Sequence, residues 1–206
     1  MNVIKPSIEI LDDLNPEQIL KKLELCGRVC YKSEDRISPE SAVKFVNSLI
    51  RRGHESVVEH VSFSVKFIVD RGVSHEIVRH RIASYSQEST RYCNYAKGDF
   101  NSEITVIEPS FFAPGTEAYT EWMMAMEMCE EHYFNLLNLG ATAEQARSVL
   151  PNSLKTEIIM TANIREWRHF LKLRTSKAAH PQIREVAKML LDELTFKLPG
   201  LFEDIN

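Results

Sequence analysis

The chain has 206 residues, 44% of them apolar and 26% charged, a balance typical of one soluble globular domain. Its formal net charge of −4 argues against a general nucleic-acid-binding protein, which would be basic over a whole face. An anion would therefore have to be bound by a local cluster of cations.

The four cysteines form no C-x-x-C pair, so we interpret them as reduced thiols. The N-terminus carries no apolar signal region, and no apolar run reaches the ~18 residues that span a membrane. We expect a single domain over residues 1–206 that is cytoplasmic and binds neither membrane nor nucleic acid.

The N-terminal part is predicted to form a strand over residues 6–10 and then a helix to about residue 29. Asn15 suits the N-cap and Pro16 the first turn. The apolar stripe of this helix is expected to consist of Ile19, Leu20, Leu23 and Leu25.

A second helix is expected to open at Ser38 in the same way and to end at Gly53. Its inner face is predicted to be Val43, Val46, Leu49 and Ile50. The following segment, 54–60, reads as a turn from helix to strand. It lacks the spacing of a zinc protease, because Val58 stands where the second histidine would be, and we expect no metal site.

Residues 61–69 alternate between apolar and polar side chains, which predicts the clearest strand of the chain. A turn at 70–72 is expected to lead into a short helix capped near Ser74. The segment from Ser84 to Thr90 is predicted to be a loop, because its short polar residues form helices poorly. Another strand is expected over 103–107.

The second half is predicted to be mainly helical. A Met- and aromatic-rich helix over about 115–139 is typical of core or subunit contact. Thr142 with Gln145, and Asn163 with Glu166, suggest capping boxes on either side of a strand at 156–162, and Pro181 starts the last helix. Helices dominate over four or so irregularly spaced strands, so we predict an α+β protein, a helix-rich single domain around a small central β-sheet.

The stretch 79–92, RHRIASYSQESTRY, stands apart because Arg79, His80 and Arg81 are consecutive and Arg91 follows. Arginine binds phosphate and carboxylate groups through two parallel hydrogen bonds, and nearby hydroxyls can complete such a site. An isolated R-x-R pair would more often be an ordinary solvated turn.

The whole stretch resembles the signature of flavin-dependent thymidylate synthases. That signature is R-H-R, a serine after seven intervening residues, and then x-R-Y, here ending in Ser89, Arg91 and Tyr92. Further blocks resemble the family in the same order and extend the resemblance over most of the chain; they are Gly27–Tyr31, Gly53–His60, Ala146–Pro151 and Asn163–Arg174.

The resemblance implies the fold of these enzymes and a homotetramer that shares FAD between subunits. It also implies reductive methylation of dUMP to dTMP, with 5,10-methylenetetrahydrofolate as the carbon donor and NADPH as the reductant. The implied FAD-binding residues are Ser56, Arg79, His80, Arg81, Gln87, Asn163, Arg165 and His169. The implied dUMP-binding residues are Glu76, Arg79, Gln87, Ser89, Arg91, Arg147 and Arg174.

Arg174 is the candidate catalytic residue, because an arginine against the uracil edge would stabilise negative charge that develops on the pyrimidine. Without the resemblance it would be an ordinary arginine at a helix C-terminus. The chain departs from the family in having Glu76 where some members carry glutamine and Gln87 where some carry glutamate. The segment after Arg174 also differs in length, which leaves the role of His180 open.

Two functions from other classes remain open. One is a nucleic-acid module that uses the arginine cluster on phosphates, and the other is a flavoprotein with different chemistry. Cys93, just beyond the signature, is the candidate thiolate if the chain instead attacks uracil as the other class of thymidylate synthases does. The family resemblance places no nucleophile there.

Overall fold

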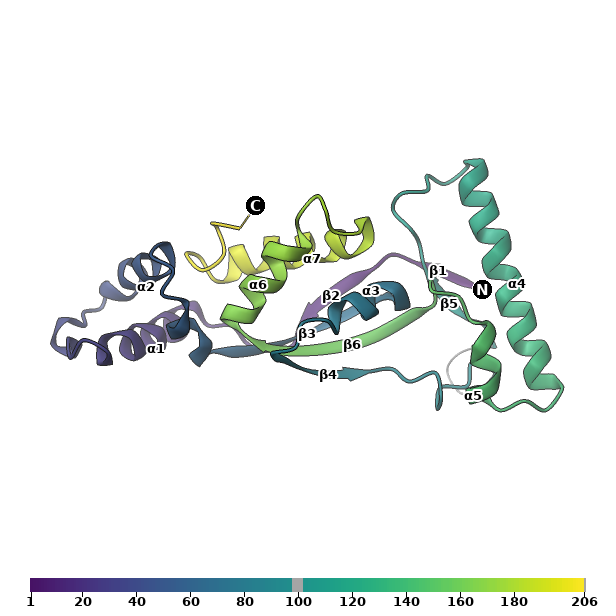
Figure 1. Ribbon diagram of the computed structural model, residues 1–206, viewed down its shortest axis with the longest axis horizontal. Helices are drawn as coiled ribbons and strands as arrows, with labels where there is room; N and C mark the ends of the chain where they lie inside the picture. The colour runs from purple at the N-terminus through teal and green to yellow at the C-terminus, as the bar shows by residue number, and fades with distance from the viewer. Residues whose placement is uncertain (98–101, 206) are drawn as a thin grey trace. The chain divides into compact units, whose positions relative to one another are not determined.

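The computed structural model describes residues 1–97 and 102–205, and Figure 1 shows the order of their elements. The strands are β1 (Asn2–Ile4), β2 (Ser7–Ile10), β3 (Ser62–Asp70), β4 (Ala83–Gln87), β5 (Thr105–Ile107) and β6 (Lys155–Asn163). The α-helices are α1 (Pro16–Val29), α2 (Ser41–Arg51), α3 (Arg71–Ile77), α4 (Glu117–Asn138), α5 (Ala143–Ala146), α6 (Ile164–Arg174) and α7 (Pro181–Lys197). Short 3-10 helices are η1 (Glu34–Arg36), η2 (Glu55–His60) and η4 (Arg147–Val149).

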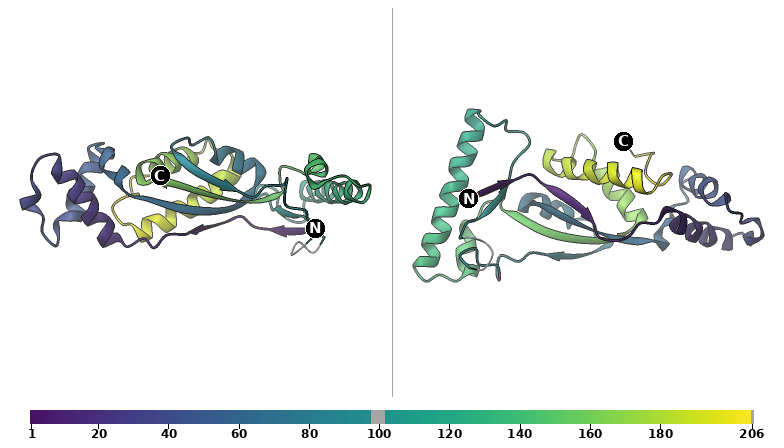
Figure 2. Two further views of the ribbon diagram at one scale, coloured as in Figure 1. Left: turned by 90° about the horizontal axis from the view of Figure 1, so that it is seen from below. Right: turned by 180° about the vertical axis from the view of Figure 1, so that it is seen from behind.

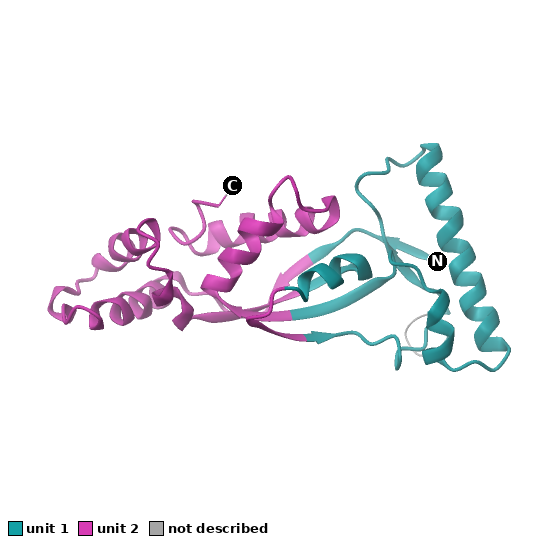
Figure 3. Cartoon of the chain, viewed as in Figure 1, with its two compact units in different colours: residues 1–7, 67–79, 86–159 teal, residues 8–66, 80–85, 160–206 magenta. Residues whose placement is uncertain are grey.

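The chain divides into two compact units, which Figure 3 colours separately. Unit 1 contains residues 1–7, 67–79 and 86–159, and unit 2 contains residues 8–66, 80–85 and 160–206. The four-stranded sheet has the order β2-β3-β6-β4, and the division between the units falls within all four of these strands. Helices and irregularly connected strands confirm the α+β class.

Unit 1 has its core between α4 and the parallel pair β1–β5, whose ribbons Figure 2 shows from two further sides. In this pair Asn2 lies opposite Thr105. The fully buried members of the core include Ile104, Val106 and Tyr133. β1 was not predicted, because three residues are too few to show a pattern. The expected strand at 103–107 is shorter and begins at Thr105.

Unit 2 is built from α1 and α2, which pack on each other, and from α6, which packs on α7 and η2. The Asn15 cap of α1 is confirmed by a 3.0 Å hydrogen bond from the Gln18 amide. The predicted inner faces are only partly right, since Leu25 and Val43 are about half exposed. Alternation in β3 is confirmed, with Val61, Phe63, Val65, Phe67 and Val69 all buried.

Several helix starts differ from the prediction. α2 begins at Ser41 and not at Ser38, whose amide instead donates to the Ser41 hydroxyl at 2.9 Å. The cap of α3 is Asp70, whose carboxylate accepts from the Val73 amide at 2.8 Å. Ser74 is buried one turn inside the helix, where its hydroxyl donates to the Arg71 carbonyl.

The predicted loop after the R-H-R sequence was wrong over residues 83–87, which form the edge strand β4 beside β6. The amide of Glu88 continues this pairing by donating to the Glu157 carbonyl at 2.9 Å. Polar residues are tolerated at a sheet edge, so local composition did not show the strand.

None of the helices in the described part of the chain combines the length and apolar content needed to cross a bilayer.

Candidate active site

Unit 2 contains a pocket of about 500 Å³, a volume within the usual range for small-molecule sites. It forms where β6 ends and α6 begins. Its lining residues come from η2, the R-H-R region and the start of α6; they are Glu55, Glu59, Ile82, Asn163, Arg165, Glu166 and His169. Asn163, Arg165 and His169 are three of the predicted FAD-binding residues, so the structure brings them together.

Asn163 is placed by its role as the cap of α6. Its side-chain oxygen accepts from the Glu166 amide at 2.9 Å, as expected. Only this half of the predicted capping box forms, because the Glu166 carboxylate lies against His80 with 3.3 Å between Oε1 and Nδ1. The helix start therefore directs Glu166 toward the signature histidine.

His80 is buried and joins two groups that are distant in sequence. Its Nε2 accepts a 3.1 Å hydrogen bond from Nε of Arg174, and its Nδ1 faces Glu166. Since Nε2 accepts, the proton of the neutral ring belongs on Nδ1. Burial, followed by the charges of Arg174 and His169, lowers the pKa of His80 to about 4, so the imidazole is neutral at pH 7.

Two neighbours complete this part of the site. The Tyr85 hydroxyl donates to the His80 backbone carbonyl, and burial with the nearby Glu166 charge raises the pKa of Tyr85 to about 12. Burial raises the pKa of Glu166 as well. The sequence predicted neither residue as part of the site, although the i, i+3 spacing of Glu166 and His169 on one helix could have indicated Glu166.

The residues of this pocket fit one side of a flavin nucleotide. Arg165 and His169 offer donors to phosphate or ribose oxygens, and Ile82, 72% exposed, offers apolar surface to a flat ring. Arg165 is held by an ion pair with Glu59, a residue that sequence reasoning did not select from the 53–60 block.

His80, Glu166 and His169 also bring three possible metal-ligand atoms within 4.8 Å of one another. The Arg174 guanidinium lies against this group through its hydrogen bond to His80. The same positive charge that lowers the pKa of His80 opposes a divalent cation.

Unit 1 holds most of the predicted dUMP-binding residues. Gln87 is fixed by hydrogen bonds from its Nε2 to the hydroxyls of Ser74, at 2.9 Å, and Thr156, at 3.2 Å. The carbonyl of Ser89 accepts from the amides of Tyr92 and Cys93, which closes a tight turn. This turn places Thr90 and Arg91 toward the α5 region.

Two arginines meet at this turn. Arg91 pairs with Glu144 at 2.7 Å, and Arg147 donates to the Thr90 hydroxyl at 3.3 Å. Guanidinium groups beside hydroxyls suit a phosphate, which would replace Glu144 as the partner of Arg91. A neighbouring network of Lys155 with Glu88 and Glu157 was not anticipated from the sequence.

The remaining residues that were considered from the sequence lie in several other parts of the chain. Arg79 and Arg81 are exposed on either side of His80, and Glu76 is half-buried with its carbonyl accepting from the Arg79 amide. Ser56 is exposed and lines a second pocket of about 300 Å³, together with Arg165. His180 caps α7 by accepting from the Gln182 amide at 3.4 Å.

Cys93 does not have the surroundings of an activated thiol. Burial, and then the negative charge of Glu88, raise the pKa of Cys93 above its ordinary value. A nucleophilic cysteine requires the opposite shift.

This chain is similar to known proteins over most of its length. Residues 10–200 match the family described as "Thymidylate synthase complementing protein". The chain belongs to this family. Among its relatives is the flavin-dependent thymidylate synthase of Geobacter sulfurreducens, which is 36% identical over 192 residues, covering 87% of this chain and 79% of that protein. The enzyme of the same name from Pyrococcus furiosus is 38% identical over 169 residues, covering 82% and 68% respectively.

A solved structure is similar over nearly the full length. It is the crystal structure of a UMP/dUMP methylase, PolB from Streptomyces cacaoi, bound with 5-Br dUMP. The TM-score is 0.80 at 26% identity, and the alignment covers 98% of this chain and 96% of the other. The resemblance read from the sequence and the fold that it implied are thereby confirmed.

Proposed function

We propose that this family member converts dUMP to dTMP by reductive methylation, with 5,10-methylenetetrahydrofolate as the carbon donor, FAD as the hydride carrier and NADPH as the reductant. The observation that carries the proposal is the hydrogen bond between His80 and Arg174. It joins the R-H-R signature to the end of the 163–174 block across 94 residues.

Arg174 is the proposed catalytic residue. Neutral His80 holds its Nε, and Glu166 holds His80 from the other side, so the guanidinium is restricted in orientation. A fixed cation at the uracil edge stabilises negative charge that develops on the pyrimidine as carbon 5 reacts. Because the cation is oriented before the reaction, little reorganisation is needed at that moment.

The proposed binding residues fall into two groups. Ser56, Arg79, His80, Arg81, Gln87, Asn163, Arg165 and His169 would hold FAD, and Glu76, Arg79, Gln87, Ser89, Arg91, Arg147 and Arg174 would hold dUMP. FAD supplies the hydride when bound, while the protein positions the substrate and polarises its pyrimidine ring. Arg91 and Arg147, beside the Ser89 turn, are the strongest candidates for the phosphate of dUMP.

Flavin content and tritium release test this proposal. We expect the purified protein to carry FAD non-covalently and to release tritium from C5-labelled dUMP when methylenetetrahydrofolate and NADPH are present. A protein that takes up no flavin after refolding with excess FAD would contradict the proposal. A yellow protein whose spectrum and turnover ignore dUMP would indicate a flavoprotein of different chemistry.

UMP is a second candidate substrate, because the structurally similar PolB is a UMP/dUMP methylase. The two nucleotides differ only in the ribose 2′-hydroxyl, and a buried polar group facing that position would discriminate between them. Comparing kcat/KM for UMP and dUMP on the same preparation decides between the two substrates.

A further inference from the structure

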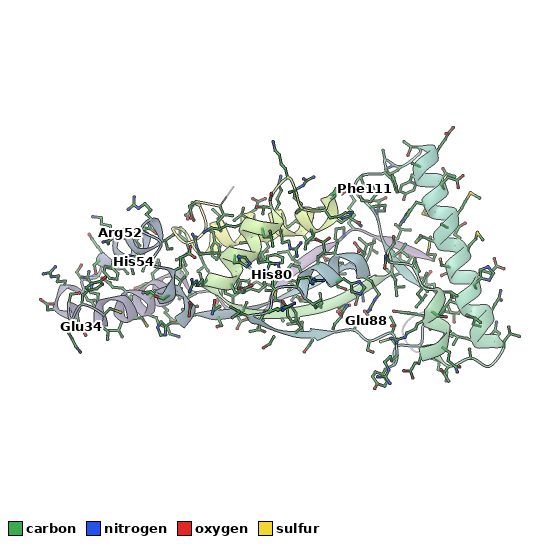
Figure 4. All side chains as sticks on the ribbon, viewed as in Figure 1. Glu34, Arg52, His54, His80, Glu88 and Phe111 are labelled. Atoms are coloured by element: carbon green, nitrogen blue, oxygen red, sulfur yellow. The ribbon has the colours of Figure 1, made fainter. Side chains whose placement is uncertain are left out.

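A pocket of about 510 Å³ lies at the C-terminal ends of α1 and α2 in unit 2. We call it the basic pocket, because its lining includes Arg28, Lys32, Arg36, Arg52 and His54, and one carboxylate, Asp35, among the described residues. Figure 4 labels Arg52 and His54 at this end of α1 and α2. No function proposed above uses it.

Most cations of the basic pocket have no ion-pair partner among the described residues. The guanidinium of Arg28 is committed to Glu24, at 2.7 Å, and stacks on Phe45. Lys32, Arg36 and Arg52 have no ion pair within residues 1–97 and 102–205. Arg52 is nevertheless held in place, since its Nη2 donates to the Ser48 hydroxyl at 2.7 Å. A chain with a net charge of −4 thus concentrates three unpaired cations at one pocket.

The turn that ends α1 places Lys32 at the basic pocket. The φ of Lys32 is +48°, a left-handed conformation that glycine adopts without strain and lysine does not. The turn is fixed by hydrogen bonds from the amides of Lys32 and Ser33 to the carbonyls of Val29 and Arg28. This is the Schellman arrangement that commonly ends a helix, and it fixes the position of Lys32, which lines the pocket.

The basic pocket connects with the candidate active site. It shares Tyr31, Leu49 and His54 with the 300 Å³ pocket that contains Ser56. That pocket in turn shares Glu55 and Arg165 with the pocket lined by His169. All three belong to unit 2, and they form a series in which neighbouring pockets share residues. A long ligand with an anionic end could therefore occupy several of them.

We propose that the basic pocket binds the carboxylates of the glutamate tail of the folate substrate. This inference rests on the proposed function, which supplies a ligand with a flat ring at one end and carboxylates at the other. Exposed cations bind several carboxylates better than one, and salt weakens this attraction. The phosphates of NADPH are the alternative source of oxygen anions.

The test compares tetrahydrofolate carrying one or five glutamates, titrated into the FAD-loaded protein by calorimetry. We expect the five-glutamate form to bind roughly tenfold more tightly, and the preference to disappear at ~1 M salt. Lys32→Gln combined with Arg36→Gln should abolish the preference and change the affinity for the one-glutamate form less than about twofold. The control Lys22→Gln with Lys44→Gln removes two exposed cations from the same helices and should keep it.

Equal binding of the two folates by the wild type, or a preference that survives in the Lys32/Arg36 variant, would overturn the inference. So would a variant in which NADPH binding falls and the folate preference remains, since the pocket would then hold a phosphate. Binding is measured without turnover. A protein that prefers the five-glutamate folate but cannot methylate dUMP would therefore contradict the proposed function and leave this inference standing. If neither folate binds, both fail. Circular dichroism of each variant confirms that it folds.

Discussion

At the scale of single residues, the site depends on a histidine that stays neutral. His80 is 3% exposed and its pKa is lowered to about 4, by burial first and by Arg174 and His169 next. Neutrality lets Nε2 accept from Arg174, which a protonated ring could not do. The ring therefore links the Glu166 carboxylate to the Arg174 guanidinium without adding charge to the site.

This shift predicts a specific dependence of stability on pH. Above pH ~6.5 His80 is neutral in both folded and unfolded chains. Between ~6.5 and ~4 only the unfolded chain takes up the proton, so the folded state loses about 1.4 kcal/mol per pH unit. Chemical denaturation of the wild type and of His80→Gln should show this loss only in the wild type. His132→Gln, which alters an exposed histidine of α4, should behave as the wild type. Parallel pH profiles for the wild type and His80→Gln would contradict the assignment.

A second residue-scale prediction separates Arg174 from Cys93. Arg174→Ala should lower kcat about 100-fold or more while the protein still binds FAD, because a fixed charge next to the pyrimidine is lost. Cys93→Ala should keep at least about a tenth of the wild-type activity, since burial and Glu88 raise the pKa of this thiol. Steady-state kinetics on folded, yellow preparations measure both. An inactive Cys93→Ala beside an active Arg174→Ala would refute the mechanism.

At the scale of elements, α6 is held on the C-terminal segment by one buried arginine. Arg168, 1% exposed, donates twice to Asp204, at 2.6 and 2.8 Å, and also to the Leu201 carbonyl. Its Nε donates to Glu55 at 3.2 Å, and Glu55 lines the candidate active-site pocket. The hydrogen bonds from Arg168 lower the pKa of Asp204. The same helix thus presents His169 and Arg174 to the site and Arg168 to the tail.

Asp204→Ala should therefore loosen residues 198–205. The change leaves buried guanidinium donors unsatisfied, which costs ~1–3 kcal/mol, and the half-exposed position of Asp204 places the loss at about 1–2 kcal/mol. Urea denaturation gives the free energy, and hydrogen exchange should show lost protection in the C-terminal segment. Asp192→Ala, on the exposed side of α7, is the control and should be neutral. Unchanged exchange at residues 198–205 would show that Arg168 is not what holds the segment.

Three helix starts and the long alternating strand were predicted well from the sequence, whereas the starts of α2 and α3 were not. Asn15, Thr142 and Pro181 act through neighbours within four residues, so their effect is visible locally. β4 was missed because its partner, β6, lies about 70 residues further along the chain and supplies the pairing that its own residues do not specify. Leu25 was predicted to be buried but is exposed. Whether an apolar residue of a helix is buried depends on which element covers it, and the sequence does not show that element.

At the scale of the whole molecule, the candidate site could be located only through the family resemblance. Arg174 and His80 are 94 residues apart, and no spacing rule connects them. Most of the proposed FAD-binding residues belong to unit 2 and most of the proposed dUMP-binding residues to unit 1, with the boundary falling between Arg79 and His80 inside the signature. The basic pocket lies outside every recognised block except at Arg28, Tyr31 and His54, so its position could not be predicted from the sequence.

The proposed homotetramer is the prediction that concerns the molecule as a whole. In α4, only Met126 and Tyr133 are buried among the described residues, while Met124 and Met128 are 52% and 58% exposed. These two methionines are four residues apart and share one face, where flexible apolar side chains suit a contact with another subunit. We expect light scattering at micromolar concentration to give four times the chain mass of 23.7 kDa.

Met124→Gln with Met128→Gln should shift this assembly toward smaller species, because polar amides would be buried without partners at the contact. Met124→Leu with Met128→Leu keeps the apolar surface and should remain a tetramer. If α4 forms the contact, the glutamine variant should also lose FAD, since the proposed cofactor site is shared between subunits. A wild type that is monomeric at micromolar concentration yet fully loaded with FAD would contradict shared sites. A glutamine variant that stays tetrameric would place the contact elsewhere than α4.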